Sequence, residues 1–224
     1  MDDMQNKNTF YICLTVLDYF MALNQNMGSK ERIQRQKEDT RKSILDAALQ
    51  IVKQEGWSAL SMRKIADVIE YTAPIIYEYF TNKEGILFEL TRQGYMHLGV
   101  KVKAARDSKQ DPEEQLEAMW LAYWDFAFAE RELYQVMFGI EVNCCEMSKK
   151  LPESDAPFDL VSEAIEQLMD HKPTEDEVCI KYYTFWSVIH GLISINLVSR
   201  GNSDEVNQQV LRTAISGIIR SIKE

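Results

Sequence analysis

Apolar residues recur at helical spacing through almost all of this chain after residue 28. The clearest stripe follows the positions i, i+3, i+4, i+7 and i+8 and therefore shares one face of an α-helix: Ile44, Ala47, Ala48, Ile51 and Val52. No stretch alternates apolar and polar residues for long enough to predict a strand. The 224 residues include only 9 Gly and 5 Pro, too few for the many turns of an all-β fold. The sequence therefore predicts an all-α protein.

Capping residues and helix breakers divide this pattern into separate helices. Gly56 suits the position after the first stripe, and Ser61 is a good N-cap for the next helix. Asn82 can cap a long helix that reaches Ala105, and Asp111 precedes a proline at a helix start. Further helices are predicted over 112–129, 130–138, about 156–170, 174–199 and 203–222, with one long loop over 139–154.

The first 27 residues form a stretch of different character. Their apolar run, 10–23, includes Asp18 and is too short and too charged to span a membrane. The flank before it is acidic, unlike the basic start of a signal peptide. Met27 can serve as an alternative start. We predict an N-terminal extension over 1–27, either mobile or a mispredicted start, with an ordered element as the alternative.

Charge is distributed unevenly along the chain. The net charge of −10 argues against a polyanionic partner for the whole molecule, but residues 28–92 carry +1 and residues 93–224 carry −9. Between Lys30 and Lys42, six basic residues stand against three acidic ones. A polyanion would therefore meet the N-terminal third and be repelled by the rest.

The stretch 61–80 has the length of a helix-turn-helix, in which the second helix lies in the major groove of DNA. Thr72 is predicted to cap the second helix, so that its N-terminal N–H groups and dipole can approach a phosphate. Pro74 falls in the first turn, where a missing N–H costs little. A small inner face of apolar side chains would fix the angle between the two helices: Ile65, Ile69, Ile76 and Phe80.

The segment GWSALSMRKIADVIEYTAPIIYEYFTNKEGIL resembles the DNA-binding domain of the TetR family of bacterial transcriptional regulators. The family pattern combines a Gly-aromatic link, Ser/Thr-hydrophobic-Arg-x-Ile-Ala and a turn, followed by a Ser/Thr, three variable residues, an aliphatic residue, Tyr and an aromatic or His, and then Lys-Glu. The matching positions are Gly56, Trp57, Ser61, Met62, Arg63, Ile65, Ala66, Thr72, Ile76, Tyr77, Tyr79, Phe80, Lys83 and Glu84. A second segment, FWSVIHGLISI, is similar through Trp186, His190 and Gly191 to the Trp-x-x-x-His-Gly signature of one class of TetR C-terminal domain.

This resemblance implies a division into two domains. Residues 28–82 would form a three-helix helix-turn-helix DNA-binding domain, and residues 83–224 a helical bundle for ligand binding and dimerisation. The implied function is a cytoplasmic homodimeric repressor, released from a palindromic operator in double-stranded DNA by a small lipophilic inducer. No enzymatic activity, cofactor, metal site or membrane association is implied.

The resemblance also assigns roles on DNA. Arg63, Ala73, Pro74 and Ile75 would face base edges or the groove floor, where Ala73 and Ile75 can contact only thymine methyl groups. Phosphate contacts are expected from Tyr77 and Lys83, with Arg41 and Lys42 near the flanking backbone. The remaining residues of the expected DNA-binding set are Ser61, Thr72 and Tyr79.

Two residues depart from the family pattern. Glu70 occupies the turn where the family often has Gly, so a left-handed backbone there would carry strain of about 1 kcal/mol. Glu78 places a negative charge on the second helix of the motif, where it either accepts a hydrogen bond from a cytosine amino group or lies at the rim of the interface.

The second half of the chain is rich in aromatic residues, which are suited to an apolar ligand pocket or to ordinary core packing. His190 is either a core histidine or a ligand contact. The −9 charge of residues 93–224 would disfavour an anion, so a neutral or cationic ligand is expected. The candidate ligand-binding residues are Trp120, Tyr123, Trp124, Phe138, Tyr183, Trp186 and His190.

Two other classes of function fit the sequence less well. A di-iron enzyme needs Glu-x-x-His pairs, but Gly94, Leu168 and Ser187 lie three residues before the histidines, and no common catalytic motif is present. A helical adaptor that binds only proteins leaves the basic stretch and the 72–83 pattern unexplained. The four cysteines, Cys13, Cys144, Cys145 and Cys179, have no metal-ligand spacing, which favours reduced thiols. The alternative is a redox role for the adjacent pair Cys144 and Cys145.

Overall fold

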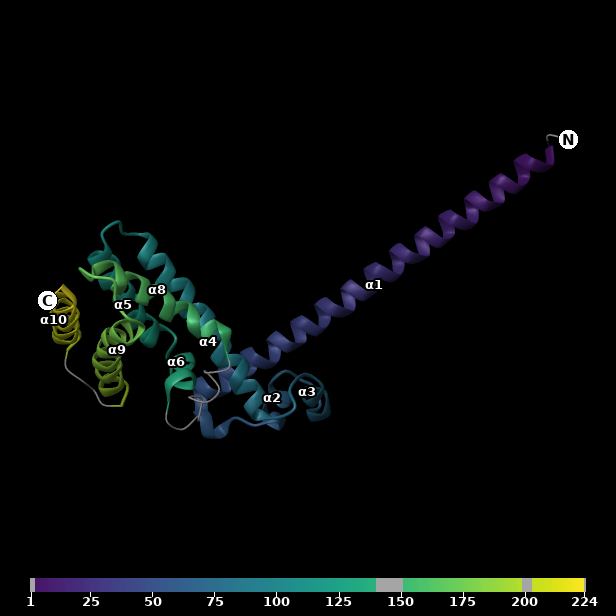
Figure 1. The fold of residues 1–224 in the computed structure, drawn as a ribbon. Helices are drawn as coiled ribbons and strands as arrows, with labels where there is room; N and C mark the ends of the chain where they lie inside the picture. Colours follow the sequence, from purple (N-terminus) through teal and green to yellow (C-terminus); the bar gives the residue numbers. More distant parts are fainter. Residues whose placement is uncertain (1–2, 140–150, 199–202, 224) are drawn as a thin grey trace. The chain divides into compact units, whose positions relative to one another are not determined.

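The computed structural model describes residues 3–139, 151–198 and 203–223, with side chains described from residue 28 onward. Helices make up nearly all of this part of the chain, and it contains no strand, which confirms the predicted all-α fold (Figure 1). The chain divides into two compact units, Met1–Lys83 and Glu84–Glu224.

The first unit contains the predicted helix-turn-helix. Gly56 ends the first helix with φ 83° and ψ 169°, a backbone conformation that is essentially restricted to glycine. The first helix packs against the two elements that follow it, and the two short helices pack against each other. In chain order the elements are α1 (Asp3–Glu55), η1 (Trp57–Ala59), α2 (Met62–Val68) and α3 (Ala73–Tyr79).

The backbone of α1 begins well before the predicted first stripe and runs as one helix from Asp3. The stretch 3–27 is therefore helical in its backbone. The expectation of a mobile extension or a mispredicted start over 1–27 is not tested by this and stays a prediction.

The core of the first unit is built from the stripes that the sequence predicts. Ile44 and Ile51 of α1, Ile65 of α2 and Ile76 of α3 are each no more than 2% exposed, and Phe80 after α3 is 4% exposed. Each such side chain contributes about 1.5–3 kcal/mol through burial. The apolar spacing therefore fixes how α2 and α3 pack.

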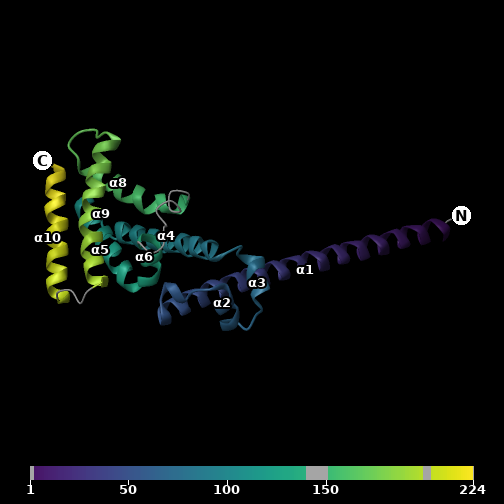
Figure 2. The same cartoon turned by 90° about the horizontal axis from the view of Figure 1, so that it is seen from below.

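The second unit is a helical bundle centred on α5, which packs against α6, α8, α9 and α10. The last two helices lie side by side and antiparallel (Figure 2). The elements are α4 (Lys83–Asp107), α5 (Pro112–Ala129), α6 (Arg131–Phe138), η2 (Pro152–Ser154), α8 (Asp155–Leu168), α9 (Glu175–Val198) and α10 (Asp204–Lys223).

The start of α5 shows why these boundaries could be predicted. Asp111 accepts hydrogen bonds from the backbone N–H groups of Glu113 and Glu114 at 2.9 and 3.2 Å, and Pro112 opens the helix. The predicted loop over 139–154 includes 140–150, which lies outside the described residues together with Cys144 and Cys145, whereas its last residues form η2.

Candidate DNA-binding and ligand-binding sites

The turn between α2 and α3 is closed by two backbone hydrogen bonds. The N–H of Tyr71 donates to the carbonyl of Ala66 at 2.9 Å, and the N–H of Glu70 donates to the carbonyl of Asp67 at 3.4 Å. Together they form a Schellman motif, which requires a left-handed residue directly after the helix cap. Glu70 fills that position with φ 58°, the only positive φ of a non-glycine residue in the described part of the chain.

The two predicted N-caps of the motif differ in the structure. Ser61 accepts a hydrogen bond from the N–H of Lys64 at 3.2 Å, as predicted. Thr72 occupies the N-cap position of α3, but its side chain makes no capping bond, so that part of the prediction is wrong. Capping bonds come from the second or third residue of a helix; Pro74 has no N–H, and the N–H of Ile75 donates to the Thr72 carbonyl at 3.0 Å.

The outer face of α3 carries the residues expected at DNA. Tyr77 is 54% exposed, and Thr72, Pro74 and Glu78 are also exposed, whereas Ala73, Ile75 and Tyr79 are half-buried. On α2 and α1, Arg63 and Lys42 are exposed. The helix therefore buries Ile76 against its own unit and presents an aromatic hydroxyl outward.

A cavity of about 440 Å³ lies within the second unit. This volume falls in the range of small-molecule pockets, about 300–1,000 Å³. Its wall contains aromatic side chains from five helices, α4, α5, α6, α8 and α9, with Asp155 at the start of α8 as the acidic group. Five of the predicted ligand residues line it: Trp120, Tyr123, Phe138, Tyr183 and Trp186.

The aromatic walls are packed against one another. The Trp120 ring stacks on Phe185 with centroids 5.3 Å apart and meets the Tyr123 ring edge-on at 5.7 Å. Burial raises the pKa of Tyr123 well above its usual value, and Tyr134 beside it adds to this. Burial also raises the pKa of Tyr182. These phenols are therefore neutral at physiological pH, and the cavity offers a ligand rings and hydroxyl groups.

Two family models match the chain, "Bacterial regulatory proteins, tetR family" over residues 44–90 and "Tetracyclin repressor-like, C-terminal domain" over residues 116–216. Together they cover about two thirds of its length. The chain belongs to the TetR family. Because this family consists of transcriptional regulators, the enzyme alternative is set aside. The C-terminal match is to the tetracyclin repressor-like class. The finer assignment to the Trp-x-x-x-His-Gly class stays a prediction.

Similar proteins of known sequence include the transcriptional activator FasR of Mycolicibacterium smegmatis, 26% identical over 132 residues, which are 56% of this chain and 60% of that protein. The regulator BetI of Serratia proteamaculans is 27% identical over 143 residues, 52% of this chain and 71% of BetI. The chain thus spans less than two thirds of the length of FasR.

Solved structures share the fold. The fatty acid degradation regulator FadR of Bacillus halodurans superposes with a TM-score of 0.64 at 17% identity, over 80% of this chain and 94% of FadR. A TetR family regulator of Marinobacter aquaeolei gives 0.60 at 17% identity, over 81% and 97%. At these identities the likeness shows the fold.

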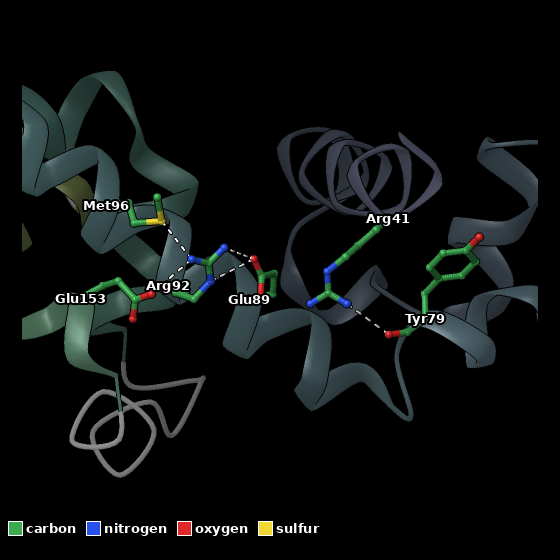
Figure 3. Close-up of polar contacts among 6 residues, drawn as sticks. All are labelled: Arg41, Tyr79, Glu89, Arg92, Met96 and Glu153. Carbon is green, nitrogen blue, oxygen red and sulfur yellow. Dashed lines mark hydrogen bonds and ion pairs between the residues drawn. The ribbon is translucent and has the colours of Figure 1, made fainter. Parts of the chain in front are cut away.

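Within the TetR helix-turn-helix unit, Arg41 has partners of its own. Its guanidinium donates to the backbone carbonyl of Tyr79 at 3.3 Å (Figure 3). It also lies 4.3 Å from the centre of the Phe80 ring. Arg41 therefore ties α1 to the end of α3, a packing role that the sequence did not predict. The Lys83 ammonium donates to the carbonyl of Trp57 at 3.0 Å, which leaves two of its three N–H donors for a phosphate.

Two of the predicted ligand residues do not line the cavity. The ring of Trp124 lies against Phe128, with centroids 4.8 Å apart. His190 stacks on Trp186 at 4.7 Å, and its Nδ1 is hydrogen-bonded to the Tyr134 hydroxyl, which also meets the Tyr123 hydroxyl at 3.2 Å. Burial lowers the pKa of His190. His190 thus packs against two rings that line the cavity, those of Trp186 and Phe138.

Sequence reasoning missed several residues of this region. Tyr95, Met137, Phe158 and Tyr182 line the cavity; the abundance of aromatic residues signalled the three rings in general terms, and Met137 was not singled out. The Arg92 guanidinium on α4 was missed as well. It donates to Glu89 at 2.6 Å and to Glu153 of η2 at 3.2 Å, and its Nη1 lies 3.0 Å from the Met96 sulfur (Figure 3).

Proposed function

We propose that this chain is a homodimeric transcriptional repressor that acts in the bacterial cytoplasm, binds a palindromic operator and is released by a small lipophilic ligand. The observation that carries the proposal is the outer face of α3. Tyr77 is exposed between the buried Ile76 and Phe80, in a helix that follows a closed turn and belongs to a TetR helix-turn-helix. Among the residues whose side chains are described, Tyr77 fills no core position of this unit, so a contact with an outside partner accounts for its exposure.

The roles on DNA follow from the kind of side chain at each position. Tyr77 and Lys83 donate to phosphates, which sets the register of the helix in the groove and carries no sequence information. Base edges are contacted by Arg63, whose guanidinium is exposed, and by the apolar groups of Ala73 and Ile75. The supporting set is Lys42, Ser61, Thr72, Pro74 and Tyr79, with Arg41 assigned to positioning α3.

The first experiment is a gel shift with the duplex found upstream of its own gene, followed by footprinting. A dimer with one short recognition helix per chain requires two half-sites about one helical turn apart, roughly 34–36 Å. A single asymmetric half-site bound by a monomer would contradict the proposal. Failure to bind this duplex or random DNA would favour the protein-binding adaptor instead.

The phosphate role is tested by Lys83→Ala, with Lys101→Ala as the matched control, since Lys101 is an exposed lysine farther along the same helix α4. Loss of one phosphate contact should weaken binding to operator and random DNA alike and reduce the slope of log affinity against log salt by about one. Lys101→Ala should change neither. An unchanged slope for Lys83→Ala would remove Lys83 from the interface.

The dimer is supported by the exposed faces of α9 and α10. Ile180, Val188 and Ile195 are 43–64% exposed on α9, and Val206 and Val210 are each 43% exposed on α10. By length and composition alone α9 could also cross a membrane. A helix-pair interface between two copies accounts for the same exposed side chains, because a glycine lies within each face and permits close approach.

Those glycines, Gly191 and Gly217, supply a clean test. A Cβ at either position would meet no described atom within 4 Å, so a side chain can begin there without a clash in the monomer. Gly191→Glu should therefore keep the fold and abolish the dimer in sedimentation analysis. A variant that remained dimeric would move the interface elsewhere. The sign of regulation is tested separately with a reporter gene, because FasR is named an activator.

The ligand proposal rests on the aromatic cavity. Tryptophan fluorescence during titration with lipophilic molecules reports binding, and the gel shift reports release of DNA. Binding with no loss of DNA affinity would contradict release by ligand. Displacement of DNA by anionic ligands alone would contradict the expectation of a neutral or cationic ligand.

A further inference from the structure

The face of α1 that packs on the helix-turn-helix continues past it toward the N-terminus. Residues that are alternately four and seven positions apart lie on one line along an α-helix, because eleven residues complete about three turns. On α1 this line runs from Val52 and Ala48, which are at most 5% exposed, to Arg41, Lys37 and Lys30. The line therefore changes from apolar to basic where it leaves the core of the unit.

Arg41 marks the point at which this line leaves the packed part of the unit. Its guanidinium donates to the carbonyl of Tyr79 at the end of α3, at 3.3 Å (Figure 3). Lys37 lies about one turn farther toward the N-terminus and lines a shallow groove of about 300 Å³ together with Tyr79 and Glu78. Lys37 thus lies beside the end of the helix that is proposed to enter the major groove.

The basic residues before Arg41 take no part in the packing of their own unit. Residues 31–39 are all exposed, and so is Lys30. Among the residues whose side chains are described, no carboxylate forms an ion pair with Lys30 or Lys37. The nearby carboxylate of Glu38 instead accepts a hydrogen bond from Gln34 at 2.8 Å. The two ammonium groups can therefore bind an anion without breaking an ion pair inside the described part of the chain.

We propose that Lys30 and Lys37 bind phosphates of the operator backbone, beside the major groove that α3 is proposed to enter. Along the helix axis they lie about 16 and 6 Å beyond Arg41, so these contacts extend the interface past the end of α3. This proposal rests on the proposed function and adds residues that precede the family match, which begins at residue 44. Duplex DNA is the polyanion that fits, because the same face of α1 is anchored to α3 through Arg41. Phosphate contacts add affinity and carry no sequence information.

The opposite side of α1 supplies a matched control. Arg32 and Arg35 are exposed as well, and each lies two residues, or about 200° around the helix, from one of the lysines. The test compares the lysine variant, Lys30→Ala with Lys37→Ala, and the arginine variant, Arg32→Ala with Arg35→Ala. Both remove two positive charges from the same helix. Fluorescence anisotropy measures the affinity of the full-length proteins for the duplex upstream of the gene and for random DNA over a range of salt, and circular dichroism checks folding.

We expect the lysine variant to reduce the slope of log affinity against log salt by about two, one for each phosphate. Its affinity for both duplexes should fall by about tenfold at low salt, the combined effect of two exposed ion pairs. The arginine variant should change neither the slope nor the affinity appreciably. Equal losses in the two variants would overturn the proposal, because net charge and not one helix face would then be responsible.

Three outcomes separate this proposal from the function on which it rests. If the unaltered protein binds the operator and the lysine variant keeps its affinity and slope, only the contacts of α1 are wrong. If the unaltered protein binds neither duplex, the proposed function is wrong, and this proposal with it. If the lysine variant retains operator binding but loses binding to phosphatidylglycerol vesicles, this face of α1 binds an anionic membrane surface and the DNA contacts are refuted.

Discussion

Replacing Glu70 by glycine should stabilise the protein. Glu70 holds φ 58° in the turn between α2 and α3, where a side chain with a Cβ costs about 1–2 kcal/mol. Glycine removes that cost but loses about 0.4–1 kcal/mol through the greater freedom of the unfolded chain. The net expectation for Glu70→Gly is a gain of about 0.5–1 kcal/mol.

The hydrogen bonds of the turn should survive this change. Both bonds of the Schellman motif use backbone atoms, the N–H groups of Tyr71 and Glu70 and the carbonyls of Ala66 and Asp67. The angle between α2 and α3 should therefore be retained. Urea and thermal unfolding measure the gain; for 1 kcal/mol, Tm should rise by about 4–8 °C if the first unit unfolds alone, or about 2–4 °C if the whole chain unfolds together.

The matched control is Glu70→Ala, which removes the charge and keeps the Cβ. Glu70 is exposed, so this variant should stay within about 0.5 kcal/mol of the original protein. Equal stabilisation by alanine and glycine would mean that the charge, and not the backbone, is responsible. A glycine variant no more stable than the original protein would refute the strain argument.

Three further predictions concern the second unit. Gly94→Ala places a Cβ 2.9 Å from Cγ of Met137, so we expect overpacking of about 1–3 kcal/mol, reduced by roughly 1 kcal/mol of helix propensity; a more stable variant in urea would contradict the close contact. Glu153→Gln should cost about 0–1 kcal/mol, and less in high salt, whereas Arg92→Met should cost more because Arg92 also pairs with the largely buried Glu89; equal losses would contradict this order. Burial lowers the pKa of His190 from its usual value of 6.5. The free energy of unfolding should therefore fall as the pH drops below about 6.5, because the unfolded chain takes up a proton there that the folded chain does not. His190→Gln should flatten this pH dependence.

Local chemistry explains what the sequence could predict in the DNA-binding unit. Ser61 caps α2 and Glu70 is left-handed, because each outcome depends on residues within one turn of the chain. The Thr72 prediction was wrong for an equally local reason, the missing N–H of Pro74 two residues later. The role of Arg41 was out of reach, because its partner Tyr79 lies 38 residues away.

Helical spacing alone could not separate the cavity wall from the core. Trp120, Tyr123 and Trp124 follow the spacing i, i+3, i+4 and therefore share one face of α5, and all three are at most 6% exposed. Only the packing of neighbouring helices decides that Trp120 and Tyr123 face the cavity while Trp124 meets Phe128. Aromatic content therefore predicted a pocket and five of its sixteen lining residues, but not which residues of this helix face line it.

Under the proposed function, the contacts of α4 would connect a ligand in the cavity to DNA binding. Met137 lines the cavity and lies against α4 at Gly94. The element η2 comes directly before the cavity-lining start of α8 and is bound to α4 through the ion pair between Glu153 and Arg92. Two parts of the cavity wall, Met137 of α6 and the start of α8 after η2, are thus linked by contacts to α4, the helix that begins at Lys83. Under the proposed function, a ligand would release DNA only to the extent that it prefers a displaced α4, and a hundredfold preference corresponds to about 2.7 kcal/mol of coupling. Because Arg92 and Gly94 lie only two residues apart, a ligand that moves either wall moves the same turn of α4, so the two contacts would act on DNA binding together.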